Sequence, residues 1–443
     1  MKNKLIVIVT CLLLMSGCEK TESGQKNSEP KIHKSTGTVV QIDEYSVTIA
    51  LSGKTKMSVF DTRDVIMDMG AYEYNTGIQV KITYIMRKGK KIAKKMKLLK
   101  PSEEMLVNKK IIMLIDQMSL EEKVGQLFFA RCPQNNAIEN LERYHIGGYV
   151  LFGRDFANQS PASASAIIAS YQAHSKIPLF IGVDEEGGTV NRISIHPSFR
   201  AVPFHSPQSL YAEGGFDLVT SDTKEKDTLL KSLGVNVNFA PVSDLSMNPE
   251  DFIYDRAFGQ NANMTGEYVK TVITQMSTDK VGSVLKHFPG YGNNADTHVG
   301  FAVDRRSIET YQKEDLIPFI KGIESGADSV LVNHVLVTSM DADTPASLSA
   351  SVHQLLRSQL KFKGVIMTDD LAMDAVRAAY GDEAAAIKAV QAGNDIILST
   401  YFEVQIPAVV QAVQNGQISE TDIDQSLIRI LKWKYKLNLL TLN

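Results

Sequence analysis

Residues 286–300 read "KHFPGYGNNADTHVG" and combine side chains that can bind a polar ligand with side chains that can move a proton. The apolar residues just before Lys286 predict a buried strand. Pro289 removes a backbone donor and the glycines after it permit unusual backbone angles, so the strand must end there. Lys286 and His287 would therefore lie at a strand end, followed by a polar loop with Asp296 and His298, where α/β enzymes keep catalytic groups. The alternative is a surface loop that happens to contain two histidines.

Further short apolar runs end in polar residues and are separated by helical segments such as "DEAAAIKAVQAG". Repeated βα units of this kind predict a parallel sheet closed as a TIM-like (β/α)8 barrel. Seven strands are clear, so a doubly wound open sheet is the alternative α/β fold. The expected strands cover residues 147–154, 178–186, 235–244, 282–290, 328–335, 364–370 and 394–400.

A parallel barrel brings the carboxyl ends of its strands to one rim. Facing carboxylates are typical of glycoside hydrolysis, whereas histidine with aspartate equally suits a metal. The sequence has no H-x-H or H-E-x-x-H, and Lys286 would repel a divalent cation, so we favour sugar chemistry without metal or cofactor. The residues expected at the rim are Asp184, Glu185, Asp244, Lys286, His287, Asn333, His334, Asp369 and Asp370.

Composition sets outer limits on the function. The chain has 443 residues, of which 44% are hydrophobic and 22% charged, with a net charge of −3. This is ordinary soluble composition, sufficient for one large core and a smaller module. A balance so close to neutrality gives no support for nucleic acid as a partner.

The first 18 residues, "MKNKLIVIVTCLLLMSGC", predict an export signal, because a basic start precedes an apolar run too short to span a membrane. "MSGC" resembles the lipobox of bacterial lipoproteins, although Met15 replaces the usual leucine. Cys18 would then carry lipid and anchor the protein to the membrane on the outer, extracytoplasmic side. A simple signal peptide is the alternative. Cys132 would remain alone, which excludes an intramolecular disulfide and a cysteine metal site.

Two segments separate this signal from the predicted barrel at 101–443. Residues 19–34 are polar and predict a flexible tether. Residues 35–100 contain short β-rich runs and predict a small sheet or barrel of about five strands, with a hairpin near Gly89. A solvated strand face is the favoured explanation for the basic residues of this hairpin, and attraction to an anionic envelope surface is the alternative. They are Arg87, Lys88, Lys90, Lys91, Lys94, Lys95 and Lys97.

Several motifs together resemble those of one known family. "KHFPGYGNNADTH" looks like the "KHFPGHG…DSH" loop of family 3 glycoside hydrolases, in their bacterial β-N-acetylglucosaminidase (β-hexosaminidase) subgroup. The resemblance spans roughly residues 110–400, and motifs in the same order have a specificity that none has alone. The other matching stretches are "MSLEEKVGQLF" (118–128), "GVDEEGGTVNR" (182–192), "NFAPVSDL" (238–245), "DRAFG" (255–259) and "GVIMTDDLAM" (364–373).

The resemblance implies a role for each matched position. Asp369 corresponds to the nucleophile, and His298, oriented by Asp296, to the acid/base on a mobile loop. Adjacent residues leaving a strand point to opposite sides, so we expect Asp370 to have an N-cap or supporting role. The implied sugar contacts are Asp184, Arg192, Arg256, Lys286 and His287.

Two positions depart from the family pattern: Tyr291 replaces the second histidine of "PGHG", and Thr189 replaces the arginine of "EGGRV". Neither removes a catalytic group. The expected activity is that of a retaining exo-β-N-acetylglucosaminidase acting on terminal GlcNAc of cell-wall fragments or chito-oligosaccharides. A family member specific for another β-sugar and an inactive envelope-binding lipoprotein are the alternatives. Whether water or phosphate is the acceptor stays open, as does the oligomeric state.

Overall fold

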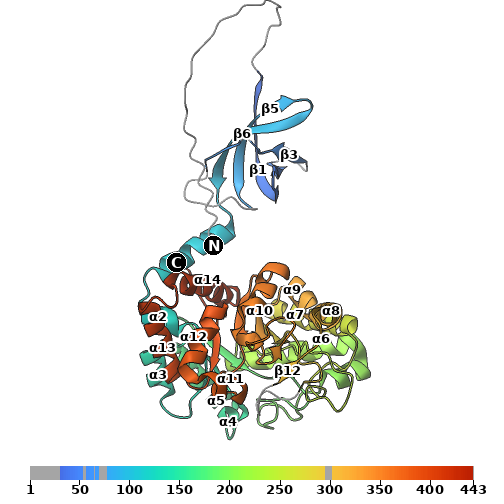
Figure 1. Ribbon diagram of the computed structural model, residues 1–443, viewed down its shortest axis with the longest axis vertical. Helices are drawn as coiled ribbons and strands as arrows, with labels where there is room; N and C mark the ends of the chain where they lie inside the picture. The colour runs from blue at the N-terminus through green and yellow to red at the C-terminus, as the bar shows by residue number, and fades with distance from the viewer. Residues whose placement is uncertain (1–29, 53–55, 64, 69–76, 295–301, 443) are drawn as a thin grey trace, which may run out of the picture. The chain divides into compact units, whose positions relative to one another are not determined.

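The computed structural model describes residues 30–442, apart from 53–55, 64, 69–76 and 295–301. The chain divides after Met105 into two compact units (Figure 1). Each has its own hydrophobic core. The expected signal peptide, Cys18 and most of the expected tether lie outside the described residues. So do Asp296 and His298. Among the described helices, none is long and apolar enough to cross a membrane.

The N-terminal unit is a small, mostly antiparallel β-sheet in the order β3-β2-β1-β5-β6-β4. An additional pairing between β3 and β6 closes it. It has one strand more than the sequence predicted, and the shortest is only three residues long and exposed. The strands are β1 (Ile32–Asp43), β2 (Ser46–Leu51), β3 (Met57–Asp61), β4 (Ile66–Asp68), β5 (Gln79–Arg87) and β6 (Lys90–Lys100).

Alternation of apolar and polar residues builds the core of this unit, because successive strand residues face opposite sides of a sheet. Val47 and Ile49 on β2, Phe60 on β3, and Val80 and Ile82 on β5 are fully buried. The hairpin predicted near Gly89 is confirmed. Its two turn residues both have positive φ (48° and 75°), as a type I′ turn requires, and the pair Arg87–Lys90 closes it.

The second unit contains the predicted barrel, an eight-stranded parallel sheet. Its strands follow one another around the ring in chain order, and β16 pairs with β7. A bridge from Met367 to Ile396 joins the remaining neighbours, so the ring is closed and the open-sheet alternative is wrong. The strands are β7 (Phe128–Arg131), β8 (Gly148–Val150), β9 (Phe180–Val183), β10 (Val237–Asn238), β11 (Gly282–Phe288), β13 (Ser329–Val332), β15 (Val365–Thr368) and β16 (Ile397–Ser399).

The strand that the sequence analysis missed is β7, "FFAR". It follows α2 almost directly, so its four residues read as the end of that helix. The helices surround the ring in Figure 1, with α6 to α9 on one side and α2, α3, α12 and α13 on the other. Their bounds are α1 (Glu103–Ile115), α2 (Leu120–Gly125), α3 (Ala137–Tyr144), α4 (Gly153–Phe156), α5 (Pro161–Ala173), α6 (Pro207–Leu233), α7 (Ala262–Asp279), α8 (Ile308–Lys313), α9 (Leu316–Glu324), α10 (Ala350–Gln354), α11 (Asp374–Tyr380), α12 (Asp382–Ala392), α13 (Phe402–Gln414) and α14 (Glu420–Lys436). A two-stranded ladder of β12 (Val303–Asp304) and β14 (Leu336–Val337) and short helical turns at Ala346–Leu348 and Leu355–Gln359 complete the unit.

Aromatic side chains fill the barrel interior. The ring centroid of Phe129 lies 5.8 Å from that of Phe180 and 5.3 Å from that of Phe239. Gly182 faces the same layer, where a Cβ atom would lie 2.6 Å from the Phe239 ring and 2.7 Å from the Phe129 ring. Only glycine therefore fits at that position.

Helix α14 covers the N-terminal end of the barrel. The Trp433 ring lies 4.4 Å from Phe180, the first residue of β9. Lys434 is fully buried, and its Nζ donates to Gln126 Oε1 (2.7 Å) and to the carbonyl of Gly147 (3.0 Å). Burial lowers the pKa of Lys434 to about 7. This end of the barrel is closed, so a ligand must approach from the other rim.

One buried carboxyl group lies in the helical layer. Asp227 on α6 is 1% exposed, and neither of its oxygens meets a hydrogen-bond donor among the described residues. Burial, and then the negative charge of Asp279, raise the pKa of Asp227 to about 8. The group is therefore protonated in the folded protein at neutral pH.

We expect Asp227→Asn to stabilise the protein, and to do so more as pH rises. The unfolded chain ionises this group above about pH 4, whereas the folded chain keeps it protonated up to about pH 8. Stability is therefore lost progressively across that window, and an amide removes the loss. Thermal unfolding should show a gain in Tm of roughly a few degrees at pH 8 and little at pH 4. Asp217→Asn, at an exposed position of the same helix, is the control. A gain independent of pH would contradict this account.

Candidate active site

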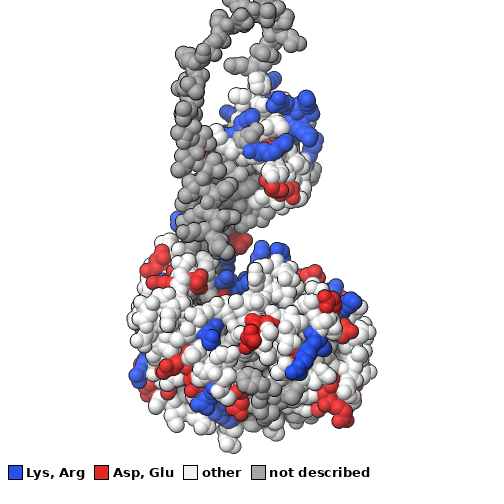
Figure 2. All heavy atoms as spheres, viewed as in Figure 1, with Lys and Arg blue, Asp and Glu red and all other residues white. Residues whose placement is uncertain are grey.

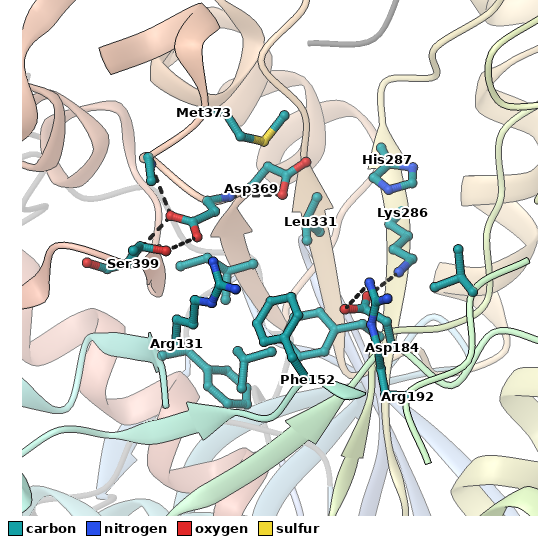
Figure 3. Close-up of a pocket in the computed structure, with 18 of the residues that line it drawn as sticks. Arg131, Phe152, Asp184, Arg192, Lys286, His287, Leu331, Asp369, Met373 and Ser399 are labelled. Carbon is teal, nitrogen blue, oxygen red and sulfur yellow. Dashed lines mark hydrogen bonds and ion pairs between the residues drawn. The ribbon is translucent and has the colours of Figure 1, made fainter. Parts of the chain in front are cut away.

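A cavity of about 430 Å³ opens at the carboxyl ends of the barrel strands. Figure 3 shows Asp184, Arg192, Lys286 and His287 on one side of it and Asp369 and Ser399 on the other. All five sugar contacts implied by the sequence line this cavity together with Asp369. They come from five separate segments of the chain: Asp184 after β9, Arg192, Arg256, Lys286 with His287 in β11, and Asp369 after β15.

Lys286 lies between two carboxylates and is only 2% exposed. Its Nζ is 2.7 Å from Asp184 Oδ1 and 2.5 Å from Glu186 Oε1. The Arg192 guanidinium approaches the other oxygen of Asp184 at 3.8 Å. A buried ammonium requires such pairing, because an unpaired charge out of water is costly.

Glu186 also holds Arg256, through Nε at 2.9 Å and NH2 at 2.8 Å. Burial alone would raise the pKa of Glu186, but the charges of Arg256 and Lys286 outweigh it and hold the pKa well below the usual range. Glu186 is thus a permanent anion that fixes two cations of the pocket. The sequence analysis quoted this residue within "DEEGG" but gave it no role.

His287 is fixed by two partners with opposite demands. Its Nδ1 is 2.7 Å from Asp244 Oδ2, and its Nε2 is 3.1 Å from the Arg256 NH2 group. Arginine only donates hydrogen bonds, so Nε2 must accept and Nδ1 must carry the proton toward Asp244. Asp244 also accepts the backbone N–H groups of His287 and Tyr291, which ties the start of the loop to the segment after β10.

The two aspartates after β15 have different surroundings. Asp370 is bound to the segment after β16: its Oδ1 accepts the backbone N–H of Thr400, and its Oδ2 accepts the Thr400 hydroxyl at 2.5 Å. Its Oδ1 also accepts the N–H of Ala372. Both aspartates line the cavity. Asp369 Oδ1 accepts the N–H of Asp370 at 2.9 Å, whereas the carboxylate of Asp370 is held by the three hydrogen bonds just given. These contacts fit the supporting role expected for Asp370.

Two rim residues named from the sequence are structural. His334 is fully buried, with Nδ1 2.7 Å from Ser347 Oγ and Nε2 3.0 Å from the carbonyl of Asp370. Asn333 donates to the carbonyl of His287 and accepts the N–H of Val335. Both brace the backbone behind the pocket and do not line it.

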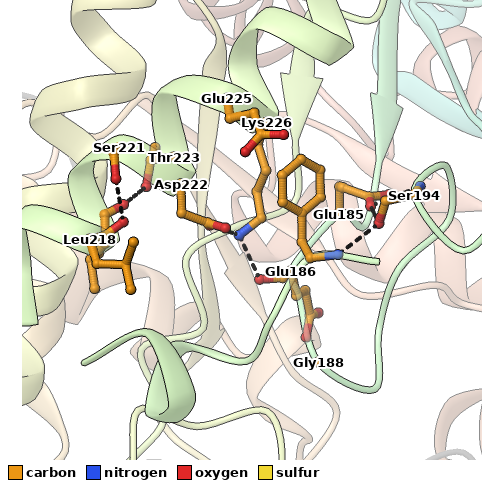
Figure 4. Close-up of polar contacts among 12 residues, drawn as sticks. Glu185, Glu186, Gly188, Ser194, Leu218, Ser221, Asp222, Thr223, Glu225 and Lys226 are labelled. Carbon is orange, nitrogen blue, oxygen red and sulfur yellow. Dashed lines mark hydrogen bonds and ion pairs between the residues drawn. The ribbon is translucent and has the colours of Figure 1, made fainter. Parts of the chain in front are cut away.

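Glu185 does not line the cavity but organises the segment that carries Arg192. Figure 4 shows it beside Ser194 of that segment. Its carboxylate accepts the backbone N–H groups of Arg192 (2.8 Å), Ile193 (2.8 Å) and Ser194 (3.1 Å), as well as the Ser194 hydroxyl. One buried side chain therefore replaces the backbone pairing that this loop lacks. Arg192 is placed in the pocket by a residue seven positions before it.

Helix α6 supports the same turn from behind. Lys226 Nζ donates to Asp222 Oδ2 (2.5 Å) and to the backbone carbonyl of Glu186 (3.3 Å), as Figure 4 shows. Gly187 has a φ of 97°, and a Cβ there would lie 2.2 Å from the carbonyl of His205. The "EEGG" sequence is thus required by close backbone approach as well as by charge.

The start of the loop that carries the Asp-x-His motif is packed. Gly290 and Gly292 have positive φ, and a Cβ on either would meet the side chain of Asp315 or of Arg306. Both glycines therefore permit tight packing here, while the expected mobility concerns the Asp296 and His298 segment, which lies outside the described residues. Tyr291 is 1% exposed, and its ring meets those of His287 (5.2 Å) and Phe252 (5.7 Å). Thr189, the other departure from the family pattern, is exposed.

The cavity has further walls that the sequence analysis did not name. Phe152 lies between two guanidinium groups, with the Cζ of Arg131 4.4 Å and the Cζ of Arg192 5.4 Å from its ring centroid. Arg131 is the last residue of β7, the strand that was not predicted. Nothing in the sequence therefore indicated that Arg131 lies on the rim. Met373 and Tyr401 complete this wall after β15 and β16. An aromatic face edged by cations suits the flat faces and hydroxyls of a sugar.

Comparison with known proteins decides the family. The model of the glycosyl hydrolase family 3 N-terminal domain matches residues 119–433. The chain belongs to glycosyl hydrolase family 3. It is 35% identical over 272 residues to a beta-hexosaminidase of Xylella fastidiosa, covering 60% of this chain and 79% of that relative. The family resemblance read from the motifs is thereby confirmed.

Solved structures agree with this assignment. A glycoside hydrolase family 3 beta-N-acetylglucosaminidase from Paenibacillus sp. str. FPU-7 is 32% identical with a TM-score of 0.68, covering 74% of this chain and 65% of that chain. A beta-N-acetylhexosaminidase from Beutenbergia cavernae is 26% identical with a TM-score of 0.65, covering 72% of this chain and 99% of that chain. The fold and the family therefore rest on sequence and structure together.

No group of three or more histidine, cysteine, aspartate or glutamate side chains is arranged to hold a metal ion within the described parts of the chain. Cys132 is buried, and burial raises the pKa of its thiol to about 12, so the thiol is unreactive as a nucleophile. The chemistry of the described site rests on carboxylates, lysine, arginine and histidine.

We expect Glu186→Gln to reduce kcat/KM by about a hundredfold and to destabilise the fold by roughly 3 kcal/mol, because it leaves two buried cations with one counter-ion fewer. Steady-state kinetics and thermal unfolding measure the two effects. Glu225→Gln is the matched control, since Glu225 pairs with Arg200 at the surface and such pairs contribute little. If the two variants behave alike, Glu186 does not hold the site together.

Proposed function

We propose that this enzyme hydrolyses terminal β-linked N-acetylglucosamine from short glycans, with retention of configuration, through a covalent glycosyl-enzyme. The observation that carries the proposal is the pocket itself. In this cavity of about 430 Å³, Asp369 lies opposite a cluster of hydrogen-bonding side chains. That volume suits one sugar ring and part of a leaving group. The relatives named beta-hexosaminidase or beta-N-acetylglucosaminidase support this choice of sugar.

In the proposed first step the Asp369 carboxylate attacks the anomeric carbon, and the bond to the leaving oxygen breaks. His298 gives its proton to that oxygen. The sugar is then bound to Asp369 as an ester. In the second step His298 takes a proton from water, whose oxygen attacks the same carbon and releases Asp369. Asp296 would orient the imidazole and favour its protonated form before the first step. His298 and Asp296 enter from the motif, since they lie outside the described residues.

The described residues would hold the sugar during both steps. Asp184 can accept hydroxyl hydrogens, while Lys286 and Arg192 can donate to hydroxyl or amide oxygens. The Nε2 atom of His287 already accepts a hydrogen bond from Arg256, so it is not free to accept one from the sugar. We therefore expect His287 to position the sugar more than to accept a hydrogen bond from it. These groups are preorganised by their own ion pairs, which lowers the cost of ordering them when substrate binds.

We further propose that the enzyme is exported and held at the outer face of a membrane through lipid on Cys18, where cell-wall fragments would be its natural substrates. The lipobox-like "MSGC" supports this location.

A panel of p-nitrophenyl β-glycosides tests the choice of sugar. We expect the β-GlcNAc reporter to be hydrolysed well above the β-glucose reporter, because the Asp-x-His motif is typical of the N-acetylglucosaminidase subgroup. Equal or reversed preference would reject this specificity while leaving the family assignment intact. No turnover of any reporter by a folded protein would favour a binding protein without activity.

Asp369 and His298 should fail in different ways. Asp369→Asn should cost several orders of magnitude with every leaving group, since no covalent bond can form. His298→Ala should be most severe for poor leaving groups and mildest for activated aryl glycosides, which need little protonation. Asp370→Asn is the control for the aspartate pair. A fluorinated GlcNAc analogue should label the peptide "GVIMTDDLAM" on Asp369, and a label on another strand would show that the nucleophile is misassigned.

Cys18→Ala should abolish retention in a membrane fraction washed at high salt, which removes attraction between charges, while turnover of small reporters by the released protein is unchanged. Cell fractionation followed by the β-GlcNAc assay measures both. If the variant stays with the membrane fraction, attachment does not depend on lipid at this residue.

A further inference from the structure

The β5–β6 hairpin of the N-terminal unit concentrates positive charge to an unusual degree. Residues 79–100 contain nine lysines and arginines and no acidic residue. The whole chain has 47 basic and 50 acidic residues, so the rest of it has 38 and 50. Figure 2 shows the basic side chains gathered over this hairpin, with the acidic ones of the unit apart from them. The hairpin is thus strongly basic, whereas the rest of the chain has more acidic than basic residues.

Strand register places part of this charge on a single face. Lys81 on β5 lies directly opposite Lys97 on β6, and Lys95 lies opposite Thr83. Lys34 on β1 pairs with Thr83 in the same row, so the row continues across three strands. Inward-facing neighbours such as Ile82 are fully buried, which fixes the lysines on the outer side. We define the basic face as Lys34, Lys81, Lys95 and Lys97, bordered at the turn by Arg87, Lys88 and Lys90.

Most of these charges have no described role in holding the module together. Lys91 differs, because its Nζ donates to Ser58 Oγ at 2.7 Å and lies 5.2 Å from the centre of the Phe60 ring. Among the described residues, ion pairing on the basic face is limited to Lys95 with Asp68 at 3.6 Å. Like charges directly opposite each other, as at Lys81 and Lys97, destabilise a sheet. The face is therefore better suited to an anionic partner than to the isolated module.

We propose that the basic face binds the surface of an anionic phospholipid bilayer. Lysines and arginines close to such a surface are attracted by its negative potential, and the attraction acts within about a Debye length. The lysines extend across β1, β5 and β6 as a two-dimensional array, which matches a plane of headgroups. Ile32, 67% exposed, is paired with Ile85 beside this array and adds an aliphatic edge for the headgroup boundary.

The position of the module in the chain favours the same partner. Ile32, the first residue of β1, is only fourteen positions after Cys18, a reach of about 50 Å at full extension. If Cys18 carries lipid as proposed above, this unit is the first folded part of the protein beyond the bilayer. Lipid would then supply attachment, and the basic face would set how the module lies on the surface.

The test uses protein beginning at residue 19, so that lipid on Cys18 cannot contribute. Co-sedimentation with phosphatidylcholine vesicles is compared with and without phosphatidylglycerol, at low and high salt. We expect binding only to the anionic vesicles and its loss at high salt. The variant Lys34→Gln/Lys81→Gln/Lys97→Gln should bind about a hundredfold more weakly, at roughly fivefold for each basic residue removed. Its Tm should not fall, because one repulsive cross-strand pair is removed.

The matched control neutralises three exposed lysines of the catalytic unit, Lys224→Gln/Lys313→Gln/Lys363→Gln, and should bind as the parent does. The proposal is overturned if the parent binds neither vesicle, or if the two triple variants bind equally. It is also overturned if the parent binds soluble polyphosphate but no vesicle, which would indicate a dissolved polyanion as partner. Turnover of the β-GlcNAc reporter is read in parallel, so failure of the proposed activity is separate from failure of bilayer binding.

Discussion

The active site depends on one buried ammonium group held between two carboxylates. Lys286 is fixed by Asp184 on the ligand side and by Glu186 behind it, and Glu186 in turn fixes Arg256. Each charge is tolerable out of water only because the others are present. The same pairing that permits burial also sets the direction in which these side chains can donate or accept hydrogen bonds. Ligand geometry is therefore largely decided before a ligand arrives.

The backbone around this cluster is shaped to keep it in place. Glu185 gathers three consecutive backbone N–H groups and so aims Arg192, while Lys226 on α6 holds the carbonyl of Glu186. Asp244, in the segment after β10, accepts the backbone N–H groups of His287 and Tyr291 and so fixes both ends of the turn that begins at His287. Carboxylates thus bind and hold loops that have no regular backbone hydrogen bonding of their own. Replacing any of these carboxylates would disturb the pocket even though no ligand contact would be removed.

Much of this arrangement followed from the sequence. The barrel, the strand ends that bear Asp184, Lys286 and Asp369, and the family were all predicted, because each strand is an apolar run that ends in polar residues. The roles of Glu185 and Glu186 could not be assigned, since adjacent identical residues give no sign of which faces the pocket. Arg131 was missed because its strand, only four residues long, follows a helix directly.

Some residues could be named from the sequence but not placed by it. His334 and Asn333 stand at a strand end like His287, yet they brace backbone behind the site, because the side on which a strand-end residue points depends on local twist. Gly290 and Gly292 were expected to end a strand through their backbone freedom, and they also lie where a Cβ atom would meet Asp315 or Arg306. The sequence shows where glycine occurs. Only the fold shows whether a glycine is there for its backbone freedom or because a side chain would not fit.

The balance of charge in the sugar-binding group carries a final consequence. Three carboxylates offset three cations there, and His287 is neutral when it accepts from Arg256 and donates to Asp244. A ligand therefore meets a dense set of oriented donors and acceptors with no net charge in that group, which suits an uncharged pyranose better than an anion. Asp369 lies across the cavity from this balanced group, so the proposed nucleophile is separated from the charges proposed to bind the sugar. The members of the balanced group are Asp184, Glu186 and Asp244 with Arg192, Arg256 and Lys286.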